Sequence, residues 1–310
     1  MPIEILTNHK LHRSAEMGLP KHFTVHRLHE AADSKAYLAE IAPRIRGAAA
    51  WHMDKKLLDA LPNLEIVANP GVGYDGVDIA ECKKRGIRVT NTPDVLNDAM
   101  AEITIGLMVA LCRRIPQADR YVRDGRWEKQ GNFPLMGELT GKTVGIIGLG
   151  RIGKEIARRC LAMKMRVVYF GRRQQPHQPY VYYGDLFEMA READWLVVVA
   201  PGGEGTRGIV SRKVLEALGP DGMLVNMARG TLVDEKALVE MLKSGGLGGA
   251  ALDVFDMEPH VPPELVVLDN VVLSPHQGSA TIKTRDAMGD LIVANLLAHF
   301  EGRPLLSPVV

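Results

Sequence analysis

The chain has 310 residues, of which 46% are hydrophobic and 24% are charged, a composition typical of folded domains and unlike that of disordered or fibrous chains. Its 38 basic and 37 acidic residues give a net charge of +1, which argues against general binding to nucleic acid or to a membrane surface. Cys82, Cys112 and Cys160 form no CxxC pair, so neither a disulfide scaffold nor a zinc site is expected, and a reduced, cytoplasmic setting fits best.

The first third of the chain alternates short apolar runs with amphipathic stretches, a pattern that predicts an α/β domain with parallel strands. Strands are expected at 3–6, 45–51, 64–68 and 87–90, and a helix at 54–61 that ends before Pro62. The N-terminus lacks the basic-then-apolar pattern of a signal peptide, and the most apolar stretch is too short to span a bilayer.

A long helix is predicted to begin at Asn97 or Asp98, because both residue types are common N-caps. The strand–helix pattern then restarts, with strands expected at 143–148, 166–170, 195–200, 223–226, 249–252 and 271–273, and a last helix at about 279–300. These patterns predict two doubly wound parallel-sheet α/β domains, with the second inserted into the first. The expected bounds are 1–96 and 285–310 for the substrate domain and 97–284 for the dinucleotide-binding domain.

Gly148, Gly150 and Gly153 fit the GxGxxG pattern, with Arg151 and Ile152 between the last two glycines. The motif directly follows an apolar strand and directly precedes a helix, as a dinucleotide-binding turn requires. Its glycines allow the backbone to approach a pyrophosphate, and the helix N-terminus offers N–H groups to that anion. We therefore expect these five residues to bind a cofactor; a glycine-rich turn without a ligand is the alternative.

The next predicted strand ends at Phe170 and is followed by Arg172 and Arg173. A cofactor with a free ribose 2′-OH usually meets an acidic residue about 20 residues beyond the glycines. Residues 169–175 contain no acid, whereas a guanidinium can pair with a 2′-phosphate. NADP(H) is therefore favoured and NAD(H) remains possible; the alternative is that both arginines are solvated loop charges.

Three later segments place polar residues after predicted strands, namely Arg229, Glu258 and His276. Because ligands bind at the carboxyl ends of strands in open α/β sheets, we expect these side chains to converge. An arginine can bind the carboxylate of a 2-keto acid and polarise its carbonyl. A histidinium supported by a glutamate can protonate the oxygen as a hydride reaches the carbon. Taken singly, each residue also fits an ordinary surface or loop position.

Together these segments resemble the D-isomer-specific 2-hydroxyacid dehydrogenase family over essentially the whole chain. The motifs that carry the resemblance are Gly-Leu-Gly-Arg-Ile-Gly, Asn-Met-Ala-Arg-Gly, Leu-Asp-Val-Phe-Asp-Met-Glu-Pro and Ser-Pro-His-Gln-Gly-Ser-Ala. The resemblance implies that Arg229 binds and polarises the substrate, that His276 is the acid/base, and that Glu258 raises its proton affinity. It also implies that the N–H groups of Val72 and Gly73 hold the substrate carboxylate.

The same resemblance implies that Asp253 meets the nicotinamide carboxamide and that Thr104 lines the cofactor cleft. The cysteine and histidine patterns themselves predict no metal site. Its Rossmann-like and flavodoxin-like domains would enclose the substrate, and a segment near Trp127 would form a homodimer. Within the family, the Gly-Arg-Arg sequence resembles NADPH-dependent glyoxylate/hydroxypyruvate reductases and the chain also resembles hydroxyphenylpyruvate reductases. We therefore expect an NADPH-preferring reductase of small 2-keto acids such as glyoxylate and hydroxypyruvate.

Two other functions remain open from the sequence. One is a dehydrogenase of the same family that acts on a bulkier aryl or branched 2-keto acid, and the other is a corepressor-like protein that senses nucleotides. Trp51, His52 and Met53 lie at the end of a predicted strand and either shape the pocket wall or simply close that strand. Five histidines near the N-terminus have no accompanying acidic cluster, so we expect ordinary polar positions for them.

Overall fold

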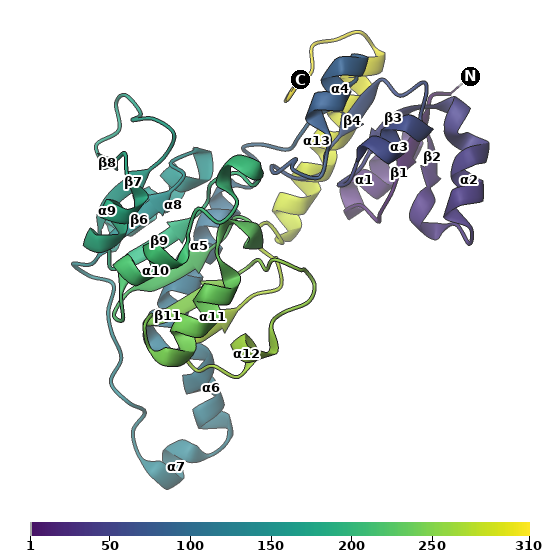
Figure 1. Cartoon of the computed structure of the whole chain (residues 1–310). Coiled ribbons are helices and arrows are strands. Elements are labelled where there is room, and N and C mark those ends of the chain that lie inside the picture. The colour runs from purple at the N-terminus through teal and green to yellow at the C-terminus, as the bar shows by residue number, and fades with distance from the viewer. Residues whose placement is uncertain (1) are drawn as a thin grey trace. The chain divides into compact units, whose positions relative to one another are not determined.

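The computed structural model describes residues 2–310, and the chain folds into two compact units (Figure 1). Unit 1 comprises residues 2–96 and Ser279–Val310, and unit 2 comprises Asn97–Gly278. Unit 2 is therefore inserted into unit 1, as the sequence predicts. The chain returns to unit 1 at Ser279 rather than at residue 285, because the last helix and its N-cap, Thr281, belong wholly to unit 1.

Unit 1 is built on a five-stranded parallel sheet in the order β2-β1-β3-β4-β5. The strands are β1 (Glu4–Thr7), β2 (Thr24–Arg27), β3 (Ile45–Ala49), β4 (Ile66–Ala68) and β5 (Arg88–Thr90). This is the flavodoxin-like strand order, in which the topological switch lies between β1 and β3. The carboxyl ends of these strands therefore carry the loops that can hold a ligand.

Helices cover both faces of this sheet. They are α1 (Arg13–Gly18), α2 (Ser34–Ile41), α3 (Lys55–Ala60), α4 (Ile79–Arg85) and α13 (Ile282–Phe300), with 3₁₀ turns at Leu19–Lys21, Leu28–Glu30 and Ala42–Arg44. Ile41, Leu58 and Cys82 from α2, α3 and α4 belong to one apolar cluster. Ala15 of α1 and Ile292 of α13 belong to the cluster on the other side. Burial on two faces explains the near-continuous apolar character of β1, β3 and β4.

Unit 2 contains a seven-stranded parallel sheet in the order β12-β11-β10-β9-β6-β7-β8. The strands are β6 (Thr143–Ile147), β7 (Arg166–Phe170), β8 (Val181–Tyr183), β9 (Trp195–Val198), β10 (Met223–Asn226), β11 (Gly249–Leu252) and β12 (Val271–Leu273). Numbered from β6, the order is 3-2-1-4-5-6-7, which is the Rossmann arrangement with one further strand. Its switch point lies between β6 and β9, next to the glycine motif.

The helices of unit 2 also form two layers. They are α5 (Asn97–Arg113), α6 (Ile115–Arg123), α7 (Arg126–Gln130), α8 (Arg151–Ala162), α9 (Leu186–Glu192), α10 (Arg212–Leu218), α11 (Glu235–Ser244) and α12 (Pro263–Val266), with 3₁₀ turns at Glu204–Thr206 and Gly230–Leu232. Helices α5 and α8 pack on one face of the sheet, and α9, α10 and α11 pack on the other. Helices α6 and α7 extend away from the sheet (Figure 1). No helix within residues 2–310 combines the length and apolar character that a membrane crossing needs.

Candidate active site

The glycine motif forms the turn between β6 and α8. Gly148 has a φ of 100°, and a Cβ at this position would lie 2.7 Å from the Cα of Ala200. A Cβ on Gly153 would lie 2.3 Å from the carbonyl oxygen of Gly148. At Gly150, by contrast, no atom beyond its own chain neighbours lies within 4 Å of the place where a Cβ would stand. Two glycines thus permit the strand and helix to pack closely, while the middle one leaves its backbone open to a ligand.

Helix α8 begins immediately after Gly150, and no side chain caps its N-terminus within the described chain. The first backbone N–H groups of a helix have no partner inside the helix and carry a partial positive charge. A dinucleotide pyrophosphate is the kind of anion that such a terminus accepts. The turn therefore fits a dinucleotide cofactor, and Arg172 and Arg173 lie exposed just beyond the end of the neighbouring strand β7.

Arg229 lies three residues after β10, and its backbone is fixed by the strand-end residue Asn226. The Asn226 side chain donates to the carbonyl of Arg229 (2.9 Å) and accepts from the N–H of Ala228 (3.1 Å). The guanidinium Nη1 of Arg229 donates to the Ala228 carbonyl at 2.7 Å. Asn226 thus shapes the turn that presents the arginine, which is half-buried.

Glu258 and His276 form a hydrogen-bonded pair, with 2.6 Å between Oε2 of Glu258 and Nδ1 of His276. The other carboxylate oxygen, Oε1, accepts from the N–H of Phe255 at 3.0 Å. Burial raises the pKa of Glu258, but the hydrogen bonds from His276 and Phe255 and the charges of His276 and Arg229 outweigh it and lower the pKa overall. An ionised carboxylate beside an imidazole favours the protonated ring. This arrangement can therefore keep a proton available at His276.

Asp253, at the end of β11, holds the turn that carries His276. It is buried, and its Oδ1 accepts from the hydroxyl of Ser274 (2.5 Å) and from the N–H of Gln277 (2.9 Å). Its Oδ2 accepts from the N–H of Gly278, also at 2.9 Å. His276 itself has a φ of 50°, a left-handed conformation that is unfavourable for a residue with a side chain. The carboxylate of Asp253 stabilises the turn that holds this conformation.

The predicted carboxylate-binding loop lies in unit 1, after β4. The Asn69 side chain donates to the carbonyls of Gly71 (2.8 Å) and Gly73 (3.0 Å), and the Asn91 side chain donates to the carbonyl of Val72 (2.9 Å). Within residues 2–310, the N–H groups of Val72 and Gly73 have no acceptor. The loop thus has its oxygens bonded to side chains and two adjacent N–H groups available for an anion.

Trp51 packs directly against this loop. A Cβ on Gly71 would lie 2.4 Å from Cζ3 of the indole, so the ring touches the loop backbone where only glycine fits. Met53 is fully buried in the core of unit 1, whereas His52 is exposed. Trp51 therefore contacts the loop at Gly71, and His52 lies against its far end, where a Cβ on Gly76 would stand 2.8 Å from the Nδ1 of His52.

Thr104 differs from the other residues singled out in the sequence. It is fully buried in α5, and its hydroxyl donates to the carbonyl of Met100 at 2.6 Å. This is a bond to the preceding turn of its own helix. The structure thus brings Arg229, Glu258, His276 and Asp253 together at neighbouring strand ends of unit 2, whereas the hydroxyl of Thr104 is used inside its helix.

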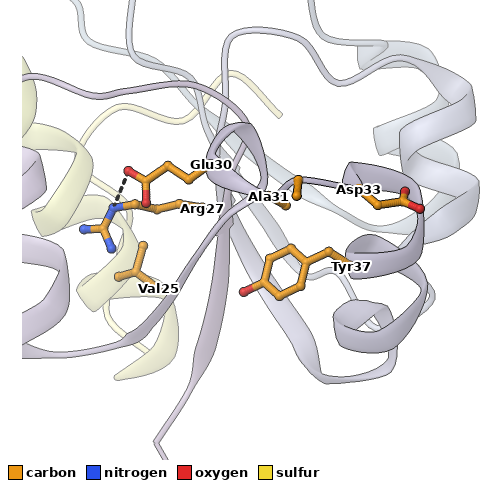
Figure 2. A pocket seen from close by; sticks show the side chains of 7 residues that line it. Val25, Arg27, Glu30, Ala31, Asp33 and Tyr37 are labelled. Carbon is orange, nitrogen blue, oxygen red and sulfur yellow. Dashed lines mark ion pairs between the residues drawn. The ribbon is translucent and has the colours of Figure 1, made fainter.

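A cavity of about 400 Å³ lies beside β2 in unit 1 and contains none of the predicted site residues (Figure 2). Its charged lining groups already have protein partners. Arg27 lies 2.9 Å from Glu16 and 3.9 Å from Glu30, and Asp33 caps the first turn of α2. We assign this cavity no part in the chemistry.

The N-terminal histidines engage separate partners. Nδ1 of His26 lies 2.8 Å from the hydroxyl of Tyr37, and Nε2 of His12 lies 2.8 Å from Nη1 of Arg285. Within residues 2–310, no group of three or more His, Cys, Asp or Glu side chains is placed to hold a metal ion.

Comparison with known proteins places this geometry in a family. The model of the NAD-binding domain of D-isomer specific 2-hydroxyacid dehydrogenases matches residues 105–278, the part of the chain with the glycine turn and the Arg229, Glu258 and His276 strand ends. The chain belongs to the D-isomer specific 2-hydroxyacid dehydrogenase family and is an oxidoreductase of that class.

Individual relatives extend over nearly the whole chain. Glyoxylate/hydroxypyruvate reductase A of Arabidopsis thaliana is 50% identical, and hydroxyphenylpyruvate reductase of Plectranthus scutellarioides is 49% identical, each over 95% of both chains. Among solved structures, the NADPH-dependent glyoxylate/hydroxypyruvate reductase of Sinorhizobium meliloti in complex with NADP and malonate is similar with a TM-score of 0.96 and 44% identity. That match covers 100% of this chain and 97% of the other.

Proposed function

We propose that the protein is an NADPH-preferring reductase of small 2-keto acids, with glyoxylate and hydroxypyruvate as its substrates. The observation that carries this proposal is the Glu258–His276 pair, held at adjacent strand ends with Arg229 close enough to influence the carboxylate. The names of the relatives in Arabidopsis thaliana and Sinorhizobium meliloti support the choice of substrates. The near-neutral net charge of +1 also suits a small-molecule ligand better than a nucleic acid.

In the proposed reaction, a reduced nicotinamide cofactor held by the glycine turn would supply the hydride that reduces the carbonyl carbon of the keto acid. His276 then gives its ring proton to the carbonyl oxygen, which becomes the hydroxyl of the product. Because Nδ1 bonds to Glu258, Nε2 is the nitrogen that faces the substrate. Glu258 stays ionised and stabilises the charged ring before the proton leaves.

We assign binding of the substrate carboxylate to Arg229 and to the N–H groups of Val72 and Gly73. A guanidinium forms strong charge-assisted hydrogen bonds to carboxylates, and its charge also polarises the adjacent carbonyl. The side-chain bonds that occupy the carbonyls of Val72 and Gly73 support this role, because they leave the two N–H groups for the anion.

We assign cofactor binding to the glycine turn with Arg151 and Ile152, with Asp253 as the predicted contact near the nicotinamide. Thr104, which was predicted to line the cofactor cleft, is buried in α5 with its hydroxyl bonded to Met100, so we assign it no direct contact. Arg172 and Arg173 would pair with the 2′-phosphate, which favours NADPH, and NADH remains a usable cofactor. The solved relative from Sinorhizobium meliloti is described as NADPH-dependent and contains NADP, which supports this preference.

The test is steady-state oxidation of NADPH and NADH with glyoxylate, hydroxypyruvate, pyruvate and an aryl pyruvate. We expect the highest kcat/KM with NADPH and either glyoxylate or hydroxypyruvate. The 49% identical hydroxyphenylpyruvate reductase makes an aryl substrate the second candidate, and a higher kcat/KM with aryl pyruvate would select it. Cofactor binding with negligible turnover of every keto acid would instead indicate a nucleotide-sensing protein.

We also propose that the chain forms a homodimer through α6, α7 and the segment that follows. Val122, Trp127 and Leu135 expose 55%, 58% and 99% of their surface, an apolar set that a second copy could cover. Light scattering of the wild type should give twice the chain mass, and Trp127→Asp should shift it toward the monomer. Three buried cysteines without disulfides suit the reduced cytoplasm, which we propose as the location.

A further inference from the structure

We propose that Gln175, with Tyr169 and Tyr182, positions the arginine loop (residues 171–175) for the 2′-phosphate of the cofactor and so sets the preference for NADPH over NADH. This inference rests on the proposed cofactor preference and adds the residues that hold the two arginines in place. They act through the loop and need not touch the phosphate themselves.

The arginine loop is fixed at both of its ends. At the first end, the hydroxyl of Tyr182 donates to the carbonyl of Gly171 at 3.1 Å. At the second end, the backbone N–H of Gln175 donates to the hydroxyl of Tyr169 at 2.8 Å. Arg172 and Arg173 lie exposed between these two attachments.

A third bond joins the arginine loop to the phosphate-binding turn. Nε2 of Gln175 donates to the carbonyl of Leu149 at 2.5 Å, and Leu149 lies between the first two glycines of the GxGxxG motif. The segment proposed to contact the 2′-phosphate and the segment proposed to contact the pyrophosphate are thus connected by one side chain. Gln175 thus fixes the distance between two protein segments that would bind the two anionic parts of one ligand.

The two tyrosines provide a rigid support for these bonds. Tyr169, in β7, is 1% exposed, and its ring centroid lies 5.3 Å from that of Tyr182, in the neighbouring edge strand β8. Packing of the rings restricts their rotation, so each hydroxyl is held where the loop needs it. The sheet itself therefore positions the arginine loop.

Anchoring matters because a mobile loop must lose conformational freedom when it binds an anion. A loop that is already held in place loses less, and the difference appears as affinity. Only a ligand with a 2′-phosphate would contact the two arginines. Loosening the loop should therefore lower the affinity for NADPH and leave the affinity for NADH unchanged. An effect on NADPH alone would distinguish positioning of the loop from a general contribution of these residues to folding.

The chain offers a matched control. Gln174 and Gln175 are adjacent, but Gln174 is exposed whereas Gln175 is half-buried and makes both bonds described above. We would measure binding of adenosine 2′,5′-bisphosphate and of AMP by calorimetry to the wild type, Gln175→Ala, Tyr182→Phe and Gln174→Ala. The two probes share the adenosine and the 5′-phosphate and differ in the 2′-phosphate.

We expect Gln175→Ala to weaken binding of the bisphosphate about 3- to 10-fold, which is the effect of one lost hydrogen bond, and to leave binding of AMP unchanged. In steady state, the same variant should raise KM for NADPH without lowering kcat and leave NADH kinetics as in the wild type. Tyr182→Phe should change the same quantities in the same direction. Because it removes only a hydroxyl, it can test the proposal even if Gln175→Ala fails to fold. Gln174→Ala should match the wild type.

The positioning role would be overturned if Gln175→Ala weakened the binding of both probes equally. It would also be overturned if the ratio of the two dissociation constants, bisphosphate to AMP, were the same in Gln175→Ala as in Gln174→Ala. The double variant Arg172→Ala/Arg173→Ala separates this failure from failure of the proposed cofactor preference. If the double variant keeps the wild-type NADPH preference, the arginines do not bind the 2′-phosphate, and both their assigned role and the positioning role are wrong, although the preference for NADPH itself stands. If it loses that preference while Gln175→Ala and Tyr182→Phe keep it, only the positioning role is wrong.

Discussion

A Cβ on Gly230 would lie 2.0 Å from the carbonyl carbon of Phe255. The turn that follows Arg229 therefore touches the segment that leads to Glu258, backbone against backbone. Glycine is required here because any side chain would push apart two of the three strand ends that form the candidate site.

Gly230→Ala should therefore impair stability and catalysis together. Overpacking typically costs about 1–3 kcal/mol, and the displaced Arg229 turn should lower kcat/KM for the keto acid. Urea unfolding and steady-state kinetics would measure the two effects. Gly106→Ala is the control, because Gly106 is exposed in α5 with no atom within 4 Å of its Cβ position. That change should leave activity intact and stabilise the helix by up to about 1 kcal/mol.

His276→Ala should abolish the proton transfer and leave the cofactor site in place. We expect kcat to fall about 10²- to 10⁴-fold, the usual contribution of a general acid. The dissociation constant of NADPH, followed by nicotinamide fluorescence, should stay within about twofold of the wild type, since the glycine turn is untouched. Turnover at the wild-type rate would remove His276 from the reaction.

Glu258→Gln should change the pH dependence of the reaction more than its geometry. The lowered pKa of Glu258 means that its carboxylate is ionised at neutral pH, where the negative charge favours a protonated imidazole. Glutamine can still bond to the ring but removes that charge. The alkaline side of the kcat/KM profile for keto-acid reduction should therefore move downward in pH. An unmoved profile would show that Glu258 only orients the ring.

Asn91→Ala should weaken substrate binding without touching the reacting groups. The variant releases the carbonyl of Val72, so the loop loses a bond that orients its N–H groups. We expect KM for glyoxylate to rise by about 3- to 10-fold with kcat nearly unchanged. Asn63→Ala removes a bond of similar length, from an exposed side chain to the carbonyl of Pro43, and should leave KM as it is.

His9 should make unit 1 sensitive to acid. Burial lowers its pKa to about 4, and the charges of His29, His52 and His12 act in the same direction. Above the ordinary value of 6.5 the ring is neutral in both the folded and the unfolded chain, so its contribution to stability is fully present. As the pH falls from 6.5 toward 4, the unfolded chain binds a proton that the folded chain excludes, and stability is lost.

His9→Gln should reduce that loss. Urea midpoints at about pH 7.5 and about pH 4.5 would show a smaller difference for the variant than for the wild type. Exposed His22 provides the comparison, and His22→Gln should follow the wild type at both values. A wild-type acid response in His9→Gln would place the sensitivity elsewhere.

The strand pattern and the inserted order of the two units were predictable because buried parallel strands are short apolar runs. The edge strand β8 was not predicted, since Val181–Tyr183 is short and half-exposed and carries no such run. The last helix begins at Ile282, capped by Thr281, and not at about residue 279. Thr281 caps the helix because its hydroxyl accepts from the N–H of Thr284 in the first turn.

The residues of the candidate site divide in the same way, into those that a sequence pattern indicates and those that only the folded chain brings into place. Arg229, Glu258 and His276 could be singled out because each follows a recognisable strand and suits the chemistry. Asn91 and Gln175 could not, because an amide side chain bonds to whichever carbonyl the folded loops bring near it. The nearest available signal was the pair of adjacent glutamines after the arginines, and only burial distinguishes them.

The buried carboxylate of Asp253 gathers a hydroxyl and two amide hydrogens around the segment that presents His276. An asparagine there would have almost the same shape, yet it would turn an NH₂ group toward hydrogens that already point inward. Orientation of the imidazole consequently depends on two enclosed oxygen atoms that both accept hydrogen bonds, and a replacement that preserves volume would still disturb it.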